Sequence, residues 1–582
     1  MILASTRGAK RERQPARLAR PIALAMLLGT MLVLTSVFAQ APPVDDAKIP
    51  AVGELKAIAA KKQALSNAFM PTGSPAHLQW IQQLADALRK AGVQNLATPS
   101  FTFTKWTPHS WSLTVLDGPN AGPVSVSTYA AYSGATPAGG VTAPLAYFSG
   151  VTSFLGPPGQ PFTPLFQVGG ETLYIAVNGQ SLAEALSSVD VSGKIVVYDL
   201  PAPQTPIEGM EQLSFFVNDP GSTLLPFNST GSTSALFLIG TLNGSLQAAG
   251  ALGAVGVLPF HPDMAKNYFF TGRIAGMPAL VLDEDAGKPL EQAIINASSP
   301  PSANLTLVAD TNPNAQANSI TGVIPGSSDK EIFLNTHDDG SNIVEDNGAI
   351  VVWALAKYFA SLPLGQRPYT ISFFISGSHF VDDVDAISYV KNNAASLRSN
   401  ALVDVAIEHV GGVELAPQAD GTFAPDGQPD ATILTLGPLL SDPSKYSAPV
   451  VEATIEYAKR VNRSIVCPFS VFPFGVSEPW LPVTNTTATI DAPAWLLVYD
   501  IPHNKEFTKW LDFQQLRDTA KGYAEMVTTF LNTPADDFTT AYTGDSARRA
   551  PAGRLLEPGH EPVVRTLLPS HPRHYWSVAN RN

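Results

Sequence analysis

Strand and helix signals alternate along residues 318–533, and no other feature of the chain limits its fold as strongly. Apolar runs of strand length are "KEIFLNT" (330–336), "YTISFFIS" (369–376), "ALVDVAI" (401–407), "ATILTL" (431–436) and "AWLLVYDI" (494–501). Helical spacing of apolar residues covers 347–361, 383–396, 446–462 and 513–532. Strands separated by helices are typical of a parallel sheet, because each helix returns the chain to the start of the next strand. The sequence therefore predicts an α/β fold with a mostly parallel central sheet flanked by helices.

The chain divides into several parts on either side of this pattern. Residues 42–160 are predicted to be an N-terminal part of the same domain that continues in 306–533. Residues 161–305 have their own strand and helix signals and are predicted to be an inserted β-rich domain. The tail 534–582 is rich in Pro, Arg and Gly, and we predict that it is disordered.

The N-terminal part carries one clear helix signal and two strand signals. "SPAHLQWIQQLADALRKAGV" (74–93) has apolar residues at helical spacing and ends at Gly92, a common helix stop. "SFTFTKW" (100–106) and "SWSLTVLDG" (110–118) alternate in polarity and predict two strands.

Residues 1–41 have the features of an export signal. A basic stretch, "RGAKRERQPARLAR", precedes the apolar run "PIALAMLLGTMLVLTSVF" and the small-residue site "AQA". The apolar run is close to the length that spans a membrane, so an uncleaved anchor is the alternative. Both alternatives predict that the main body lies outside the cytoplasm, either periplasmic or extracellular.

The charge argues against nucleic-acid binding, and the cysteine content excludes two kinds of cysteine-dependent structure. Loss of residues 1–41 removes six Lys/Arg and one Glu, so the net charge moves from −13 to about −18. A chain this acidic has no general attraction for nucleic acid. Cys467 is the single cysteine, which excludes an intramolecular disulfide and a cysteine-rich zinc site.

Histidines and carboxylates gather where the predicted strands end. In an open α/β sheet, ligands bind beyond the carboxyl ends of the strands. Imidazole nitrogens and carboxylate oxygens there suit zinc. The residues at these ends are His337, Asp338, Asp339, Ser378, His379, Glu408, His409 and His503.

Each of these residues also has an ordinary structural explanation. Asp, Asn and Gly favour turns, so "HDDGSN" and "EDNGA" are consistent with simple loops. Asp346 is suited to capping the helix that follows it. His409 is consistent with a hydrogen-bonded core histidine.

One set of motifs resembles a known enzyme family, and a second set resembles a known domain. "FLNTHDDG…EDNGAIVVWALAKYF", "AIEHVG" and "IPHNKEFTKWLDFQQL" resemble the zinc aminopeptidase family that includes bacterial leucyl aminopeptidases, glutamate carboxypeptidase II and the transferrin receptor. The family's His-x-Asp and Asp-Asn-x-x-Gly patterns correspond to His337-Asp338-Asp339 and Asp346-Asn347-Gly348, with the glycine displaced. "VSGKIVVYDL" and "AAGALGAVGVL" resemble a protease-associated (PA) domain within 161–305.

The resemblance implies a peptidase fold with two zinc ions that share a water molecule. It implies that His337, Asp346 and Glu408 hold one ion. Asp346, His503 and the second Glu of a Glu-Glu pair would hold the other. Asp339 would fix the ring of His337 from outside the metal site.

The chain departs from the family in "ISGSHFVDD", where the Glu-Glu pair is expected. Alignment without a gap places His379 at the general-base position and Phe380 at the ligand position. A shift by one residue places Ser378 and His379 there instead. Both alignments leave the pair without a glutamate, so a second zinc ion loses a ligand. The nearby Asp382 and Asp383 suit a helix start.

Three functions are compatible with these observations. The first is an exported zinc metallopeptidase-like hydrolase, an aminopeptidase acting on peptides or amino-acid derivatives, with one zinc ion and His379 as base. The alternative is an inactive peptidase fold that binds a peptide or protein partner. The third is another metal enzyme, such as a cyclase or amidase. We predict the first, with contact to a membrane only if the N-terminal segment is uncleaved.

Overall fold

The computed structural model describes most of the chain between residues 41 and 543. The described ranges are 41–168, 171–200, 204–206, 214–218, 228–230, 232–258, 276–417, 423–429, 432–437, 446–461, 465–468, 475–491 and 510–543. The predicted export signal up to residue 40, the strand predicted at 494–501, His503 and the tail from residue 544 lie outside them. Among the described helices, none has the length and apolar character needed to cross a membrane.

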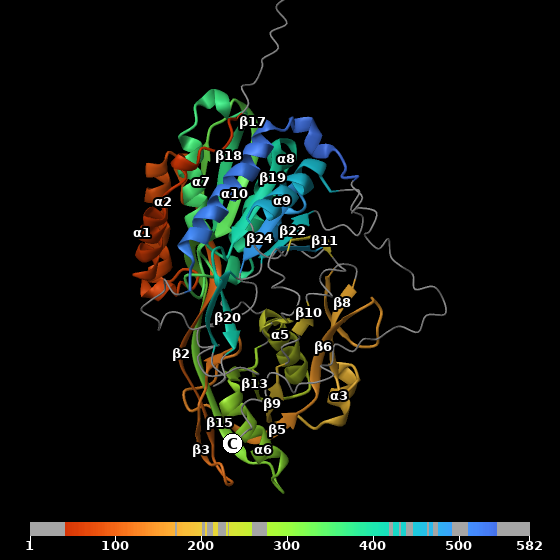
Figure 1. The fold of residues 1–582 in the computed structure, drawn as a ribbon. Helices are drawn as coiled ribbons and strands as arrows, with labels where there is room; N and C mark the ends of the chain where they lie inside the picture. Colours follow the sequence, from red (N-terminus) through yellow and green to blue (C-terminus); the bar gives the residue numbers. More distant parts are fainter. Residues whose placement is uncertain are drawn as a thin grey trace, which may run out of the picture. The chain divides into compact units, whose positions relative to one another are not determined.

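A nine-stranded sheet forms the centre of the main domain (Figure 1). Its strands, in spatial order, are β1 (Gln94–Ala97), β16 (Ile320–Ile324), β18 (Tyr369–Ser376), β17 (Ser328–His337), β19 (Ala401–Glu408), β24 (Asn485–Asp491), β22 (Thr432–Gly437), β23 (Ile465–Pro468) and β11 (Ser214–Asn218). The central strands β18, β17, β19 and β24 are parallel to one another. β16 and β22, which flank them, run antiparallel. The α/β fold with a parallel centre is confirmed, and antiparallel strands extend the sheet on both sides.

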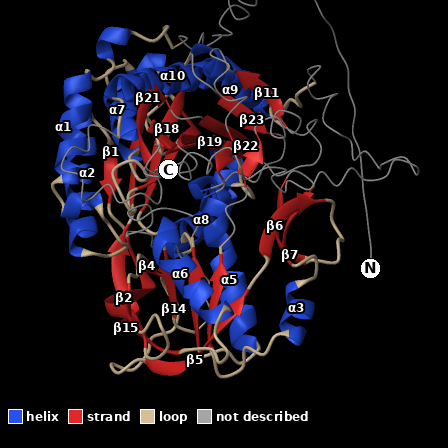
Figure 2. Cartoon of the chain, turned by 60° about the horizontal axis from the view of Figure 1, so that its bottom comes forward, coloured by secondary structure: helices blue, strands red, loops and turns tan. Residues whose placement is uncertain are grey.

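Helices cover both faces of this sheet (Figure 2). The helices on the first face are α1 (Val52–Gln63), α2 (Pro75–Ala91), α7 (Gly348–Ala360), α9 (Ala448–Arg460) and α10 (Phe513–Asn532). Leu334 of β17 joins their core, whereas Phe333, the residue before it, packs on Trp480 at the opposite face. That second face is covered by α8 (Val384–Asn400) and the short helix η6 (Gly475–Trp480). Successive residues of a strand point to opposite faces, so this assignment also orients the residues at the strand ends.

The predicted helices occur with small shifts at their ends. Predicted segments 347–361, 383–396, 446–462 and 513–532 correspond to α7, α8, α9 and α10. α2 corresponds to the prediction at 74–93, and its ends have the expected caps. The Ser74 hydroxyl accepts a hydrogen bond from the His77 N–H, and Gly92 ends the helix at φ = 109°.

A second sheet of eight strands is formed by residues between 100 and 318. Its order is β3 (Gly122–Val124), β2 (Ser100–Val115), β15 (Ser302–Asn318), β5 (Val141–Phe148), β9 (Ile195–Asp199), β13 (Gly253–Val257), β14 (Ala279–Leu282) and β4 (Thr128–Tyr129). Three helices, α3 (Leu182–Ser188), α5 (Ser232–Ala248) and α6 (Glu284–Ile295), belong to the same part of the chain. Small sheets are formed by β6 (Val151–Gly156), β7 (Thr163–Val168) and β8 (Glu171–Val177), by β10 (Gln204–Pro206) and β12 (Asn228–Thr230), and by β20 (Val413–Pro417) and β21 (Phe423–Pro429).

One strand prediction in this region is wrong. The segments 100–106 and 110–118 belong to a single strand, β2, which continues through the residues between them. β15 pairs with β2 along this whole length, with two shifts in register, and this pairing holds the chain extended past Pro108. β15 spans Ser302–Asn318, so the predicted domain boundary at residue 305 falls within a strand.

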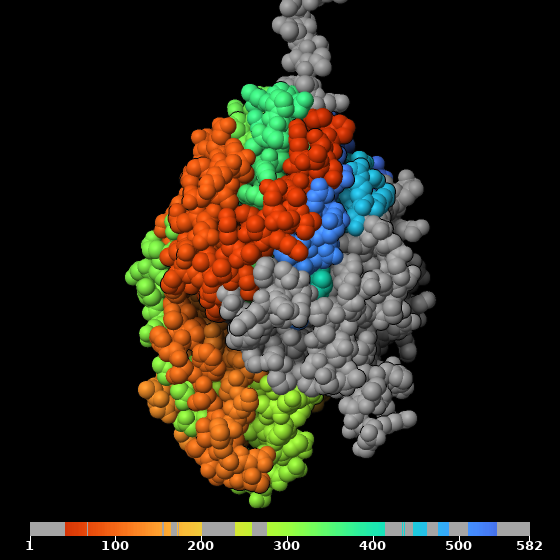
Figure 3. Space-filling view, turned by 60° about the vertical axis from the view of Figure 1, so that its left-hand side comes forward, coloured from red at the N-terminus to blue at the C-terminus, as the bar shows by residue number. Residues whose placement is uncertain are grey.

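The N-terminal and C-terminal segments lie beside each other on the surface. Figure 3 shows the red N-terminal residues next to the blue α10 segment. Asp46 forms ion pairs with Arg517 at 3.1 Å and with Lys521 at 3.4 Å, both on α10. The first described residues are therefore part of the main domain.

Candidate metal site

His337 and Glu408 stand at the carboxyl ends of adjacent parallel strands. His337 is the last residue of β17, and Glu408 is the last residue of β19. The register pairs Asn335 with Ala406, two residues before each of them. Ala406 packs on Val476 of η6, so His337 and Glu408 emerge side by side on the η6 face.

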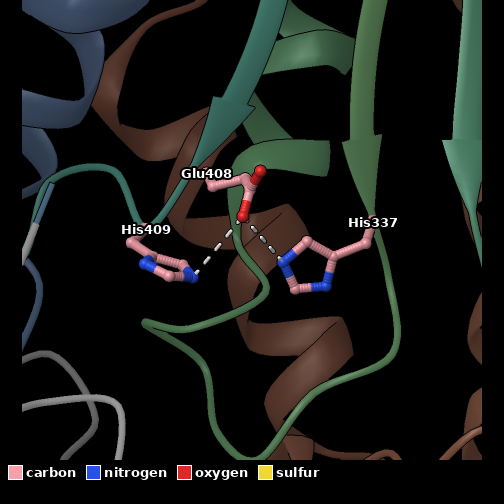
Figure 4. Close-up of side chains that lie close together, drawn as sticks. All are labelled: His337, Glu408 and His409. Carbon is pink, nitrogen blue, oxygen red and sulfur yellow. Dashed lines mark ion pairs between the residues drawn. The ribbon is translucent and has the colours of Figure 1, made fainter. Parts of the chain in front are cut away.

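These two residues and His409 form a buried cluster. The Oε2 atom of Glu408 lies 3.7 Å from His337 Nε2 and 3.9 Å from His409 Nε2. Figure 4 shows the carboxylate between the two imidazole rings. One ligand atom from each residue lies within 4.8 Å of the others, and all three side chains are buried. The sequence prediction brought His337 and Glu408 together, and it left His409 open between a strand-end ligand and a hydrogen-bonded core histidine.

Glu345 is a fourth member that the sequence prediction missed. Its Oε1 atom lies 3.8 Å from His337 Nε2 and 3.6 Å from His409 Nε2. Its side chain is 4% exposed. The only sequence signal for it is its place directly before Asp346, in the loop between β17 and α7.

Hydrogen bonds outside the cluster aim these side chains inward. His337 Nδ1 donates to the backbone oxygen of Asp339 at 2.7 Å, which turns Nε2 toward the carboxylates of Glu345 and Glu408. The N–H of Val476 donates to Glu408 Oε1 at 2.8 Å, and the N–H of Ser341 donates to Glu345 Oε2 at 3.2 Å. Each carboxylate thus binds a backbone N–H with one oxygen and turns the other toward the histidines.

The geometry fits a tetrahedral cation better than it fits hydrogen bonding. The four separations of 3.6–3.9 Å exceed hydrogen-bond length, for which N···O is about 2.9 Å. Ligand atoms about 2.1 Å from one zinc ion in tetrahedral geometry lie roughly 3.4 Å apart. His337 Nε2 and both ring nitrogens of His409 are buried without a hydrogen-bond partner in the described part of the chain. Orphaned imidazole nitrogens of this kind are suited to a metal ion.

The electrostatics also favour a cation. Burial alone opposes protonation of His337, but the carboxylates of Glu345 and Glu408 raise its pKa to about 9. The same negative potential that draws a proton to this ring attracts a divalent ion.

The backbone at His409 is held in an unusual conformation. Its φ is 51°, in the left-handed region that costs a residue other than glycine about 1 kcal/mol or more. This conformation follows directly after β19, and the ring of His409 lies beside Glu408. Strain of this kind is concentrated at functional sites.

His379, the predicted base, lies next to the cluster. Its ring centroid is 4.5 Å from that of His337, and its side chain is 14% exposed. Its Nδ1 atom is 3.1 Å from Asp383 Oδ1. Burial opposes its protonation, but the Asp383 carboxylate raises its pKa well above the usual value.

Phe380, which the ungapped alignment with the family motif places at a ligand position, belongs to an apolar cluster. It packs with Ala131, Trp106 and Tyr132 from the N-terminal part of the chain. The backbone N–H groups of His379 and Phe380 both donate to the carboxylate of Asp339, at 3.2 and 3.1 Å.

Three predicted residues have partners of their own. Asp346 faces Lys62, whose Nζ lies 2.7 Å from Asp346 Oδ2. Asp338 lies 2.9 Å from His77 Nε2. The Asp339 carboxylate accepts a hydrogen bond from the Thr72 hydroxyl at 2.6 Å, and its backbone oxygen is the partner of His337.

Solved aminopeptidase structures resemble this chain, whereas no protein-family model and no curated protein matches it. A zinc aminopeptidase from Bacillus subtilis has a TM-score of 0.52 at 14% identity, covering 83% of this chain and 97% of its own. An aminopeptidase from Aneurinibacillus sp. strain AM-1 has a TM-score of 0.50 at 14% identity, covering 86% and 97%. A peptidase M28 precursor from Shewanella amazonensis has a TM-score of 0.52 at 15% identity, covering 84% and 98%. The chain therefore has the zinc aminopeptidase-like α/β fold.

Proposed function

We propose that this protein is an exported peptidase that holds one zinc ion between His337, Glu345, Glu408 and His409. The observation that carries the proposal is the convergence of these buried side chains at separations of 3.6–3.9 Å. The aminopeptidase-like fold supports a peptide substrate, since the site lies at the carboxyl ends of the parallel strands, where such sheets bind ligands.

Zinc in such a site supplies Lewis acidity toward a carbonyl oxygen and lowers the pKa of a bound water. His337 and His409 donate lone pairs, and Glu345 and Glu408 bring the negative charge. The backbone of Val476 and Asp339 fixes Glu408 and His337, which keeps these two groups in place before a ligand arrives.

His379 is the group best placed to move a proton. It adjoins His337 and, unlike that residue, has an exposed part of its side chain. Asp383 engages Nδ1, which leaves Nε2 for the substrate. Because the Asp383 carboxylate raises the pKa of His379, its protonated ring would donate a proton to the leaving amine in peptide hydrolysis.

The location of the protein rests on its N-terminal segment. The basic stretch, apolar run and small-residue site at 1–41 support export to the periplasm or the medium. An uncleaved segment would instead anchor the protein to the membrane.

Zinc content measured together with activity tests the proposal. Wild-type protein dialysed against zinc should hold about one equivalent by elemental analysis. His409→Ala should lose it, whereas His109→Ala, whose side chain is 48% exposed and lies outside the cluster, should keep it. His379→Ala should keep zinc but lose about 10²–10⁴-fold in release of amino acids from aminoacyl reporters. A wild-type protein that holds no zinc would exclude the site.

Peptide binding without catalysis is the second candidate. It is favoured by Phe380, which occupies an aromatic cluster where the family motif expects a glutamate. Zinc binding without hydrolysis of any aminoacyl or peptidyl reporter would select this function over the first.

A further inference from the structure

Lys62 is a fully buried cation that faces the candidate metal site. It lies in the last turn of α1, with 0% of its side chain exposed. Its Nζ atom lies 2.6 Å from the backbone oxygen of Asp346 and 2.7 Å from Oδ2 of the same residue. The ring of Trp80 lies 5.3 Å from Nζ. A buried ammonium needs such partners, because removal from water is costly for an unpaired charge.

Glu345 and Asp346 are neighbours in sequence but face different groups. Glu345 turns Oε1 toward the two histidines, at 3.8 and 3.6 Å. Asp346 turns Oδ2 toward Lys62 instead, and its Oδ1 is buried without a hydrogen-bond partner in the described part of the chain. Two consecutive carboxylates are thus divided between a protein cation and the histidine cluster.

The Lys62 ammonium is the cation that contacts Asp346, whereas Glu345 and Glu408 lie against the histidines. The neighbouring acids have separate donors, since Asp338 is bonded to His77 and Asp339 accepts the N–H groups of His379 and Phe380.

We infer that Lys62 is a built-in cation that keeps Asp346 out of the metal's ligand set and limits the site to one divalent ion. The inference rests on the proposed zinc site. Lys62 is a positioning residue here, because it touches Asp346 and acts on the metal only through that carboxylate.

Calorimetric titration with zinc on three variants tests this inference. Asp346→Asn should bind zinc with the stoichiometry of the wild type and with an affinity within about threefold of it, because Asp346 is not a ligand. The double variant Lys62→Met/Asp346→Asn, which removes both charges, should do the same. Lys62→Met alone frees a buried carboxylate and should raise the uptake above one equivalent.

The possible results separate the inference from the proposed function. Loss of more than about 100-fold in affinity in Asp346→Asn would make Asp346 a ligand and overturn the inference while leaving a zinc site. Unchanged stoichiometry and affinity in a folded Lys62→Met would also overturn it. If Lys62→Met does not fold, the other two variants still decide whether Asp346 binds the metal. A wild-type protein without zinc would overturn the proposed function as well.

Discussion

Gly475 is a single residue on which the position of Glu408 depends. Its φ is +82°, and a Cβ atom built on it would lie 2.2 Å from Glu408 Oε1. Gly475→Ala should therefore move the carboxylate away from the histidines. We expect roughly a 10–100-fold loss of zinc affinity, the range found when groups around a metal ligand are disturbed.

A second glycine with a similar φ separates the steric contact with Glu408 from the cost of placing alanine in a left-handed backbone. Gly179 has φ = +77° but nothing within 4 Å of a built Cβ. Gly179→Ala should lose about 1 kcal/mol of folding free energy from the left-handed backbone and leave zinc binding unchanged. Equal zinc affinities in the two variants would mean that Gly475 does not set the position of Glu408.

Glu291 should make the folding free energy depend on pH. Burial raises its pKa to about 7, against the opposing effect of Lys288. Glu291 in the folded protein then binds a proton more tightly than it does in the unfolded chain, so protonation of Glu291 stabilises the fold at low pH. This stabilisation is lost as the pH rises from about 4.5 to 7, by up to about 3 kcal/mol.

Denaturation by urea at pH 5 and pH 7.5 measures this dependence. Wild type should lose more stability than Glu291→Gln between the two conditions. Glu456→Gln, at a half-exposed position, should behave like the wild type. An identical pH dependence in wild type and Glu291→Gln would rule out this role for Glu291.

At the scale of elements, the turn between β18 and α8 depends on Asp385. Its Oδ1 accepts hydrogen bonds from the hydroxyls of Ser376 and Ser378, at 2.7 and 2.5 Å, and its Oδ2 accepts one from the N–H of Gly377. Asp385→Ala leaves these buried donors unpaired, and we expect a loss of about 3 kcal/mol or more in unfolding free energy.

Two further variants identify the cause of this loss. Asp385→Asn keeps one acceptor oxygen and should lose less than the alanine variant. Asp86→Ala removes an exposed carboxylate, paired only with Arg89 on the surface, and should change stability by less than about 1 kcal/mol. A small effect in Asp385→Ala would mean that the turn forms without this residue. His379 lies in this turn, so loss of the turn would also displace His379.

Elements were predictable where local chemistry decides them. The cap residues Ser74 and Gly92 mark both ends of α2, and the apolar runs mark β17, β18 and β19. The strand β2 was not predictable in full, because Pro108 and His109 have little strand preference of their own. Their extended form depends on β15, about 200 positions later in the chain.

At the scale of the whole molecule, the site is assembled from segments far apart in sequence. Lys62 and His77 come from the N-terminal helices and meet Asp346 and Asp338, separated from them by 284 and 261 positions. This packing buries these four side chains near the carboxyl ends of the central strands. Removal of the N-terminal helices would thus alter the electrostatics of the site as well as the core.

The sequence by itself determined the α/β class, the helices of the main domain and the strand ends at which His337 and Glu408 stand. Periodicity and caps act over a few residues, so they can be recognised without the fold. Only the tertiary structure decided that His409 and Glu345 join the cluster and that Asp346 turns to Lys62. Those outcomes depend on the left-handed backbone of His409 after β19 and on the N–H groups of Val476 and Ser341. They also depend on the buried ammonium of Lys62 from the distant helix α1. Contacts of this kind arise from packing and leave no local pattern in the chain.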